Sequence, residues 1–235
     1  MPVSSRAAAG LAFVTLLGAS PAVAAERFHY HWTLDGFVGA LASLFVPSRG
    51  EGELTYEPIE GGRERGELLV TSKQSKGNEY FRYGTVWEPA TRRTISASSD
   101  LVWRGETKSK RADLEGENLI DVVSAIQLLR RTPPDNALRL EIWSDGRLYP
   151  VIVLPRERAK RKLPDGEVTA RRYSVHGVPV PDRRFWKGEL DLWIADDPTA
   201  TPVEIVVSRR GARVRLVLAE TPVQKPAPAA GDPLP

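Results

Sequence analysis

Apolar and polar residues alternate along most of this chain, as they do in β-strands that bury one face. The first such run places four apolar side chains on one face: Phe28, Tyr30, Trp32 and Leu34. Comparable runs follow at residues 53–56, 67–73, 79–88, 94–98, 101–108, 138–143, 148–154, 168–175, 189–195, 203–208 and 214–219. Short strands at this spacing predict a meandering antiparallel sheet of roughly ten strands.

Turn-forming residues separate several of these runs. Residues 145–146 (Asp-Gly) lie between two alternating runs. They predict a tight hairpin, because glycine accepts a positive φ and aspartate tolerates one. Residues 164–166 and 209–211 predict two further hairpins. Residues 37–46 are apolar throughout and fit either a short helix or a buried strand, and their place among strands favours a strand.

Residues 117–131 (ENLIDVVSAIQLLRR) depart from the alternation and predict a helix of about four turns. Its apolar stripe consists of Leu119, Val122, Val123, Ile126 and Leu129. Asn118 or Asp121 can accept hydrogen bonds from free N–H groups near the start, and Pro133 and Pro134 prevent continuation. The chain is therefore predicted to be mainly β, a curved antiparallel sheet or open half-barrel with this one helix packed on its concave side.

The N-terminal residues have the features of a secretory signal peptide. Arg6 supplies a positive charge, residues 7–17 form a short apolar core, and residues 19–25 end in small side chains. The apolar core is too short to span a bilayer, and the chain has no cysteine to carry a lipid at the cleavage point. We therefore expect cleavage after Ala24 or Ala25 and a periplasmic protein that neither spans the membrane nor is lipidated.

Composition narrows the class of the mature protein. About 210 residues follow the cleavage point, and residues 26–220 are enough for a single β-rich domain with a sizeable core. The formal net charge of +3 is too small to indicate nucleic acid as a partner. The absence of cysteine excludes disulfides and thiol chemistry. Residues 221–235 are rich in proline and alanine and are predicted to be a disordered tail.

Two segments of the chain resemble an exported bacterial family known as domain of unknown function 3108. The first runs from Asp121 to Arg130 with the pattern D-x-x-S-A-x-x-x-x-R, and strands at residues 138–153 follow it. The second comprises residues 192–197 and 202–205. The resemblance implies an open half-barrel that curls around a helix, similar to the periplasmic carriers of lipoproteins. It implies no reaction and no catalytic residue.

Aromatic side chains on the strands form a candidate ligand-binding surface. A curved sheet lined with tryptophan and leucine can shield an acyl chain from water. The expected binding residues are Trp32, Phe81, Trp103, Val122, Ile126, Trp143 and Trp193. The same side chains also fit an ordinary sheet core, which is the more common role of strand aromatics.

Other polar patterns favour structure over chemistry. His29 and His31 share one strand face but lack a placed third ligand, so no metal site is predicted. Residues 196–197 (Asp-Asp) precede a proline and indicate a turn. Basic clusters at residues 156–162 and 209–215 fit either hairpin ends or contacts with anionic lipid. The sequence has no nucleophile-elbow, zinc-protease, P-loop or dinucleotide motif.

These observations favour a non-enzymatic periplasmic protein of the cell envelope that needs no cofactor and binds a lipid or another hydrophobic ligand. The alternative is a structural or protein-interaction module of envelope assembly, with an envelope protein as its partner. An uncharacterised hydrolase or metalloenzyme is the third class. Fold analogy alone does not separate the three.

Overall fold

The computed structural model describes residues 25–35, 48–72, 79–116, 118–209 and 211–220. The expected signal segment, the apolar residues 37–46 and the proline-rich tail lie outside these residues, apart from Ala25. No helix in the described part of the chain is long and apolar enough to cross a membrane.

One sheet of 13 strands accounts for most of the described residues. Its first six strands are β1 (Glu26–Asp35), β2 (Arg49–Ile59), β3 (Arg63–Ser72), β4 (Tyr80–Glu88), β5 (Arg93–Trp103) and β6 (Glu106–Asp113). The other seven are β7 (Leu119–Asp121), β8 (Leu138–Ser144), β9 (Arg147–Leu163), β10 (Gly166–Gly177), β11 (Glu189–Ala195), β12 (Pro202–Arg209) and β13 (Ala212–Leu218). A 3₁₀ turn, η1 (Glu60–Gly62), joins β2 to β3, and the helix α2 (Val122–Arg131) follows β7.

The strand order is β6-β5-β4-β3-β2-β1-β13-β12-β11-β10-β9-β8-β7. The chain thus runs outward from β1 to β6, crosses to the other edge at β7, and returns strand by strand to β13. There the last strand pairs with the first, Trp32 opposite Leu216. Neighbouring strands are antiparallel except β7 and β8, which are parallel because α2 carries the chain back between them.

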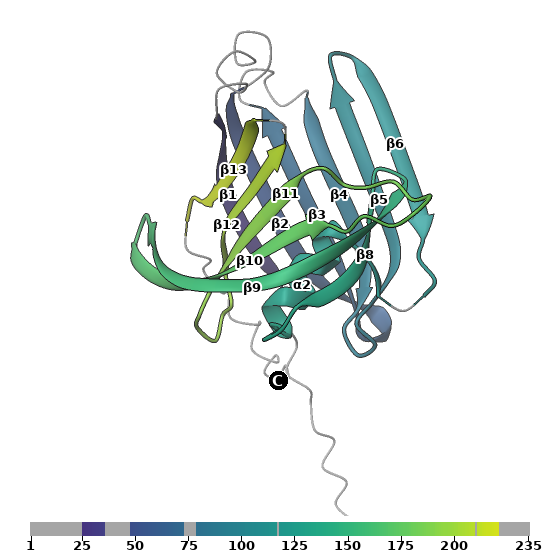
Figure 1. The fold of residues 1–235 in the computed structure, drawn as a ribbon. Helices are drawn as coiled ribbons and strands as arrows, with labels where there is room; N and C mark the ends of the chain where they lie inside the picture. The colour runs from purple at the N-terminus through teal and green to yellow at the C-terminus, as the bar shows by residue number, and fades with distance from the viewer. Residues whose placement is uncertain (1–24, 36–47, 73–78, 117, 210, 221–235) are drawn as a thin grey trace, which may run out of the picture.

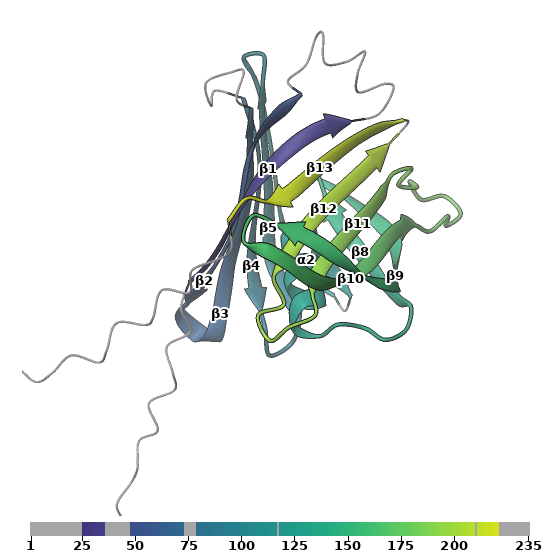
Figure 2. The same ribbon diagram turned by 90° about the vertical axis from the view of Figure 1, so that its left-hand side faces the viewer.

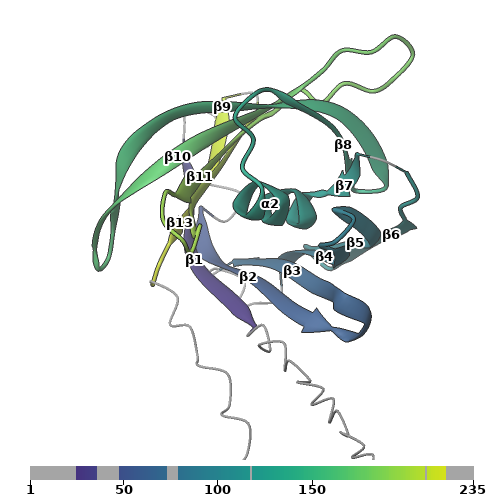
Figure 3. The ribbon, with the colours of Figure 1, turned by 90° about the horizontal axis from the view of Figure 1, so that it is seen from below.

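The sheet curls until its two ends approach each other without pairing. Figures 1 and 3 show this curl around α2, and Figure 2 shows strands β11 to β13 inclined to the wall formed by β2 to β5. Leu114, just after β6, and Asp121 of β7 both form hydrogen bonds with β5. Leu114 N donates to Ile95 O at 2.9 Å, and Asp121 N donates to Thr94 Oγ1 at 3.3 Å.

The helix occupies the space inside the curl. Residues 123–130 of α2 are all buried, and Val123, Ile126 and Leu129 join the main apolar core formed by the inner faces of the strands. Gly66 on β3 allows this close approach, because a Cβ there would lie 2.8 Å from Cγ1 of Val123. The predicted mainly β, open and curved sheet with one packed helix is confirmed.

Two local predictions were wrong. Residues 94–98 and 101–108 are not two strands, because β5 continues to Trp103 and the turn falls at Arg104 and Gly105, which have positive φ angles of 50° and 80°. The helix does not begin at residue 117, because residues 119–121 pair with β8. That pairing is the one parallel pair in the described, otherwise antiparallel sheet.

Candidate functional site

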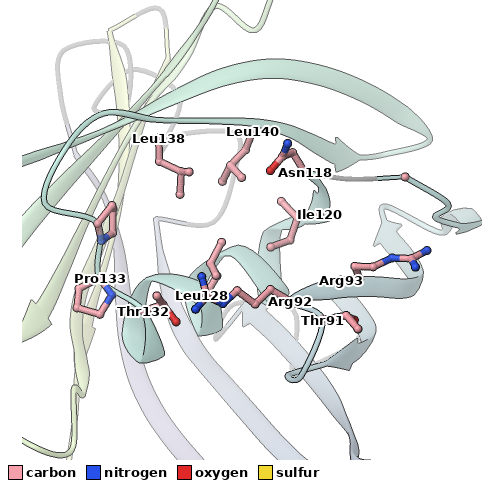
Figure 4. Close-up of a pocket in the computed structure, with 12 residues that line it drawn as sticks. Thr91, Arg92, Arg93, Asn118, Ile120, Leu128, Thr132, Pro133, Leu138 and Leu140 are labelled. Carbon is pink, nitrogen blue, oxygen red and sulfur yellow. The ribbon is translucent and has the colours of Figure 1, made fainter.

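A pocket of about 680 Å³ lies beside the C-terminal half of α2 (Figure 4). It is bounded by α2, β7, β8 and the turn between β4 and β5. The residues that line it are Thr91, Arg92, Arg93, Gly116, Asn118, Ile120, Leu128, Thr132, Pro133, Pro134, Leu138 and Leu140. Its volume falls within the range of small-molecule binding pockets.

Apolar side chains from three elements form the wall of this pocket. Leu138 and Leu140 point inward from alternate positions of β8, and Arg139 between them is exposed. Ile120 of β7 and Leu128 of α2 complete the apolar wall. The wall exists because the parallel β7–β8 pair lies over the helix that connects the two strands.

The polar side chains of the pocket come from its turns. Arg92 has a positive φ of 55° and belongs to the turn between β4 and β5. In Figure 4 its side chain extends toward Leu128 and the C-terminal end of α2, whereas Arg93 points away from the apolar wall. Asn118 and Thr132 are the other polar groups near the helix, and no lining side chain is acidic.

A buried carboxylate fixes the N-terminal end of the helix. Asp121 is the N-cap of α2, and its Oδ1 accepts hydrogen bonds from Val123 N at 2.8 Å and Ser124 N at 3.2 Å. Its Oδ2 accepts from the hydroxyls of Thr85 at 2.6 Å, Thr94 at 3.0 Å and Ser124 at 2.5 Å. Both carboxylate oxygens of Asp121 are therefore occupied by hydrogen-bond donors, and this residue has a structural role.

A buried arginine, Arg130, fixes the C-terminal end of α2. The Arg130 side chain is only 4% exposed, and its Nη1 and Nη2 donate to Glu26 at 2.8 and 3.1 Å. Nη1 also donates to Gln127 Oε1 at 2.6 Å, and Nε donates to the Ala200 carbonyl at 2.9 Å. The guanidinium lies 4.6 Å from the ring centre of Phe28, within cation–π range.

Burial and the charge of Arg130 shift the pKa values of the groups around it. Burial alone would raise the pKa of Glu26, but the hydrogen bonds and charge of Arg130 outweigh it and hold that pKa below the usual value. Burial raises the pKa of Tyr30 and Tyr56, so both hydroxyls remain protonated donors. Tyr56 Oη donates to Val123 O at 2.8 Å, which ties the helix to β2. The helix is therefore a fixed wall of the pocket.

The seven side chains expected to bind a ligand do not form one site. Trp32 is buried on the inner face of the sheet, and its Nε1 donates a hydrogen bond to Thr71 O at 2.8 Å. Phe81 is 39% exposed and stacks on Tyr83, while Trp103 is half-buried beside Arg104. Trp32 belongs to the main core.

The remaining four are distributed over the helix and two smaller clusters. Val122 is half-buried on α2, and Ile126 is buried in the main core. Trp143 packs with Ala97 and Leu114 in a separate small cluster.

Trp193 lies on the opposite sheet face from the main core. Its neighbours Leu192 and Ile194 belong to that core, whereas Trp193 packs with Ala170, Ala195 and Val203. The Arg161 guanidinium covers its ring at 3.4 Å from the centroid.

None of the seven predicted binding residues lines the pocket. The sequence analysis did not identify the residues that do line it as binding residues. Leu138 and Leu140 do occupy one face of a predicted strand, and Leu128 lies within the predicted helix. These residues come together at the pocket because β7 pairs with β8, and the alternation of apolar and polar residues does not predict that pairing. Arg92 and Arg93 lie between the predicted strands at residues 79–88 and 94–98, and no pattern in the sequence singled them out.

Several of the other candidate residues have structural partners. His29 is exposed on the outer face, with Nδ1 3.2 Å from Glu53 Oε2. Within the described residues, no group of three or more metal-ligating side chains comes together. Asp197 Oδ1 accepts from Thr199 N at 2.9 Å, the turn geometry expected for residues 196–197. In the basic clusters, Arg161 and Arg215 lie 3.3 and 2.6 Å from the Glu204 carboxylate.

Comparison with known proteins gives structural neighbours, of which two are described below, and no family. No family model and no curated protein match the chain. A beta-barrel-like protein of the domain of unknown function 1849 from Brucella abortus aligns at a TM-score of 0.44 and 9% identity, covering 84% of this chain and 96% of that one. A putative outer membrane lipoprotein-sorting protein domain from Vibrio parahaemolyticus aligns at a TM-score of 0.34 and 9% identity, covering 84% of each chain. The resemblance to domain of unknown function 3108 stays a prediction.

Proposed function

We propose that this protein is a non-enzymatic binding protein of the bacterial cell envelope that holds the acyl chain of a lipid beside α2. The observation that carries the proposal is the pocket of about 680 Å³ with an apolar wall of Ile120, Leu128, Leu138 and Leu140. Each CH₂ group removed from water there contributes about 0.8 kcal/mol to binding. The periplasm is the compartment proposed from the N-terminal sequence.

The chemistry of the lining favours binding over catalysis. Its polar side chains are those of arginine, threonine and asparagine, without the carboxylate or imidazole that acid–base catalysis commonly uses. The nearby carboxylate of Asp121 is occupied by hydrogen-bond donors. Residues 91–93, in the turn beside the pocket, are exposed, and the proposal has the ligand enter past them while the helix stays in place.

Native mass spectrometry tests the proposal on the chain purified from a periplasm without detergent. We expect an added mass of lipid size in the wild type. Leu138→Trp, which fills the pocket from a half-buried position, should remove most of that mass. Leu69→Trp is the matched control, because Leu69 is a half-buried leucine on β3 next to the core residue Leu68 and faces away from the pocket.

Two results would overturn the proposal. The first is an apo mass in the wild type together with failure of any acyl ligand to bind when added. The second is an equal lipid mass in Leu138→Trp and Leu69→Trp, both folded by circular dichroism.

A further inference from the structure

We infer that the ligand of this pocket is an acyl chain with an anionic head group, a carboxylate or a phosphate, and that Arg92 binds the head group. The inference rests on the proposed function and names the substrate class of the same site. It is carried by the position of a charged side chain next to an apolar wall.

The geometry places a cation at one side of the pocket and hydrocarbon at the other. Figure 4 shows Leu138, Leu140 and Ile120 on one side and the Arg92 side chain crossing the other. The positive φ of Arg92, 55°, is a conformation that residues other than glycine rarely adopt. In Figure 4 the Arg92 side chain lies across the pocket, whereas Arg93 next to it points away.

The charge of Arg92 is not neutralised within the described residues. Among the described residues, neither the Arg92 side chain nor the Arg93 side chain has a hydrogen bond or ion pair, and no acidic residue lines the pocket. The carboxylate of Glu88, on the same turn, lies 4.0 Å from Arg63 and accepts a hydrogen bond from Thr91. A guanidinium free of partners beside an apolar wall matches an amphiphile with an anionic end, because its planar donors pair with carboxylate and phosphate oxygens.

A competing role for Arg92 is purely structural. Its guanidinium lies near the C-terminal end of α2, where a positive charge interacts favourably with the free carbonyl groups of a helix. That role predicts a change in stability when Arg92 is replaced. It predicts no change in the preference for charged over uncharged ligands, so the two roles are separable.

The test uses two ligands of equal chain length, hexadecanoic acid and hexadecan-1-ol. Each displaces a fluorescent apolar probe from the full chain at pH 8 and low salt. We expect the acid to bind about tenfold more tightly than the alcohol, as one charge-assisted contact would give. Arg92→Gln should abolish this preference with little effect on the alcohol. Arg139→Gln, an exposed arginine on β8 between two lining leucines, should preserve it.

The outcomes separate this inference from the proposed function. If neither ligand displaces the probe, the proposed function fails and the inference with it. If both bind equally in the wild type, or Arg92→Gln keeps the preference for the acid, the pocket stands and the head-group inference is overturned. If inorganic phosphate alone displaces the probe as well as the acid does, the site binds free anions. The inference that the ligand is an amphiphile is then wrong.

Discussion

Arg130 near the end of α2 and Glu26 at the start of β1 form a two-point ion pair, with N–O distances of 2.8 and 3.1 Å. The two residues are 104 positions apart in the chain. This pair joins the first strand of the sheet to the only helix in the described residues, and the helix supplies one wall of the pocket. One wall of the pocket is thus held by a contact between residues far apart in the chain.

Replacing Arg130 should destabilise the fold strongly. Arg130→Met would leave Glu26 without its cationic partner, and breaking one side of a buried ion pair costs about 3–5 kcal/mol. Chemical denaturation in urea measures the free energy of unfolding. Arg139→Met, at an exposed position on β8, should change it by less than about 0.5 kcal/mol. Equal effects of the two variants would contradict a special role for Arg130.

The pair should also make stability depend on pH in a defined direction. The pKa of Glu26 is lower in the folded protein than its usual value of 4.5, so the unfolded state binds the proton more readily. The stabilisation is then complete above pH 4.5 and is lost as the pH falls through the folded pKa.

Glu26→Gln provides the measurement for this dependence. The difference in unfolding free energy between wild type and Glu26→Gln should be largest near neutral pH and shrink below pH 4.5. A difference that stays constant from pH 7 to pH 3 would show that the charge of Glu26 contributes nothing.

Removing the helix cap should cost more than an ordinary cap does. Asp121→Ala deletes the acceptor of two helix N–H groups and of the hydroxyls of Thr85 and Thr94. The loss of an N-cap alone costs about 1 kcal/mol, and unpaired buried hydroxyls add about 1–3 kcal/mol. Denaturation of Asp121→Ala against Asp113→Ala, an exposed aspartate at the end of β6, checks the value. A loss below about 1 kcal/mol would contradict the network.

Gly50 on β2 should not tolerate a side chain. A Cβ at this position would lie 1.9 Å from the Thr71 carbonyl oxygen and 2.4 Å from Nε1 of Trp32, so backbone would have to move. Gly50→Ala should therefore lower the melting temperature by several degrees, since overpacking costs about 1–3 kcal/mol. Gly84→Ala is the control, because its Cβ would meet only the Ser98 hydroxyl, at 2.8 Å, which can rotate. Equal melting temperatures for the two variants would count against this packing.

Trp193 should matter for stability and not for ligand binding. It is 5% exposed on the outer face, beneath the Arg161 guanidinium and away from the pocket. Trp193→Leu should lose about 2–4 kcal/mol of stability through lost packing. It should retain the full ligand mass in native mass spectrometry. Loss of ligand in a folded Trp193→Leu variant would place the binding surface on the outer face instead.

Local patterns in the sequence were sufficient for several of the strands and turns. The hairpin at Asp145 and Gly146 has positive φ angles of 51° and 77°, as the Asp-Gly pair predicted. The strand at residues 189–195 has the predicted bounds. The helix ends at Arg131, shortly before the two prolines. These features depend on residues close together in the chain, so a short window of sequence contains their cause.

The N-terminal part of the predicted helix shows where a short segment of sequence is not enough to predict the structure. Leu119 and Val122 lie on the same helical stripe in the sequence, yet residues 119–121 are a strand because they pair with residues 141–143 of β8. Hydrogen bonds to a distant strand thus override the local preference. The buried partners of Arg130 were equally hidden, since Glu26 and Ala200 are distant in the chain.

The sequence by itself determined that this chain forms alternating strands, where several hairpins turn, and that one helix interrupts them. The sequence also predicted that the helix packs inside the curl. Only the tertiary structure decided that Trp193 faces outward, and that Arg92 meets Leu138 and Leu140 at one pocket. The physical reason is that alternation assigns a residue to one of two sheet faces without saying which face becomes concave. That choice follows from the pairing of β1 with β13 and of β7 with β8, contacts between residues far apart in the chain.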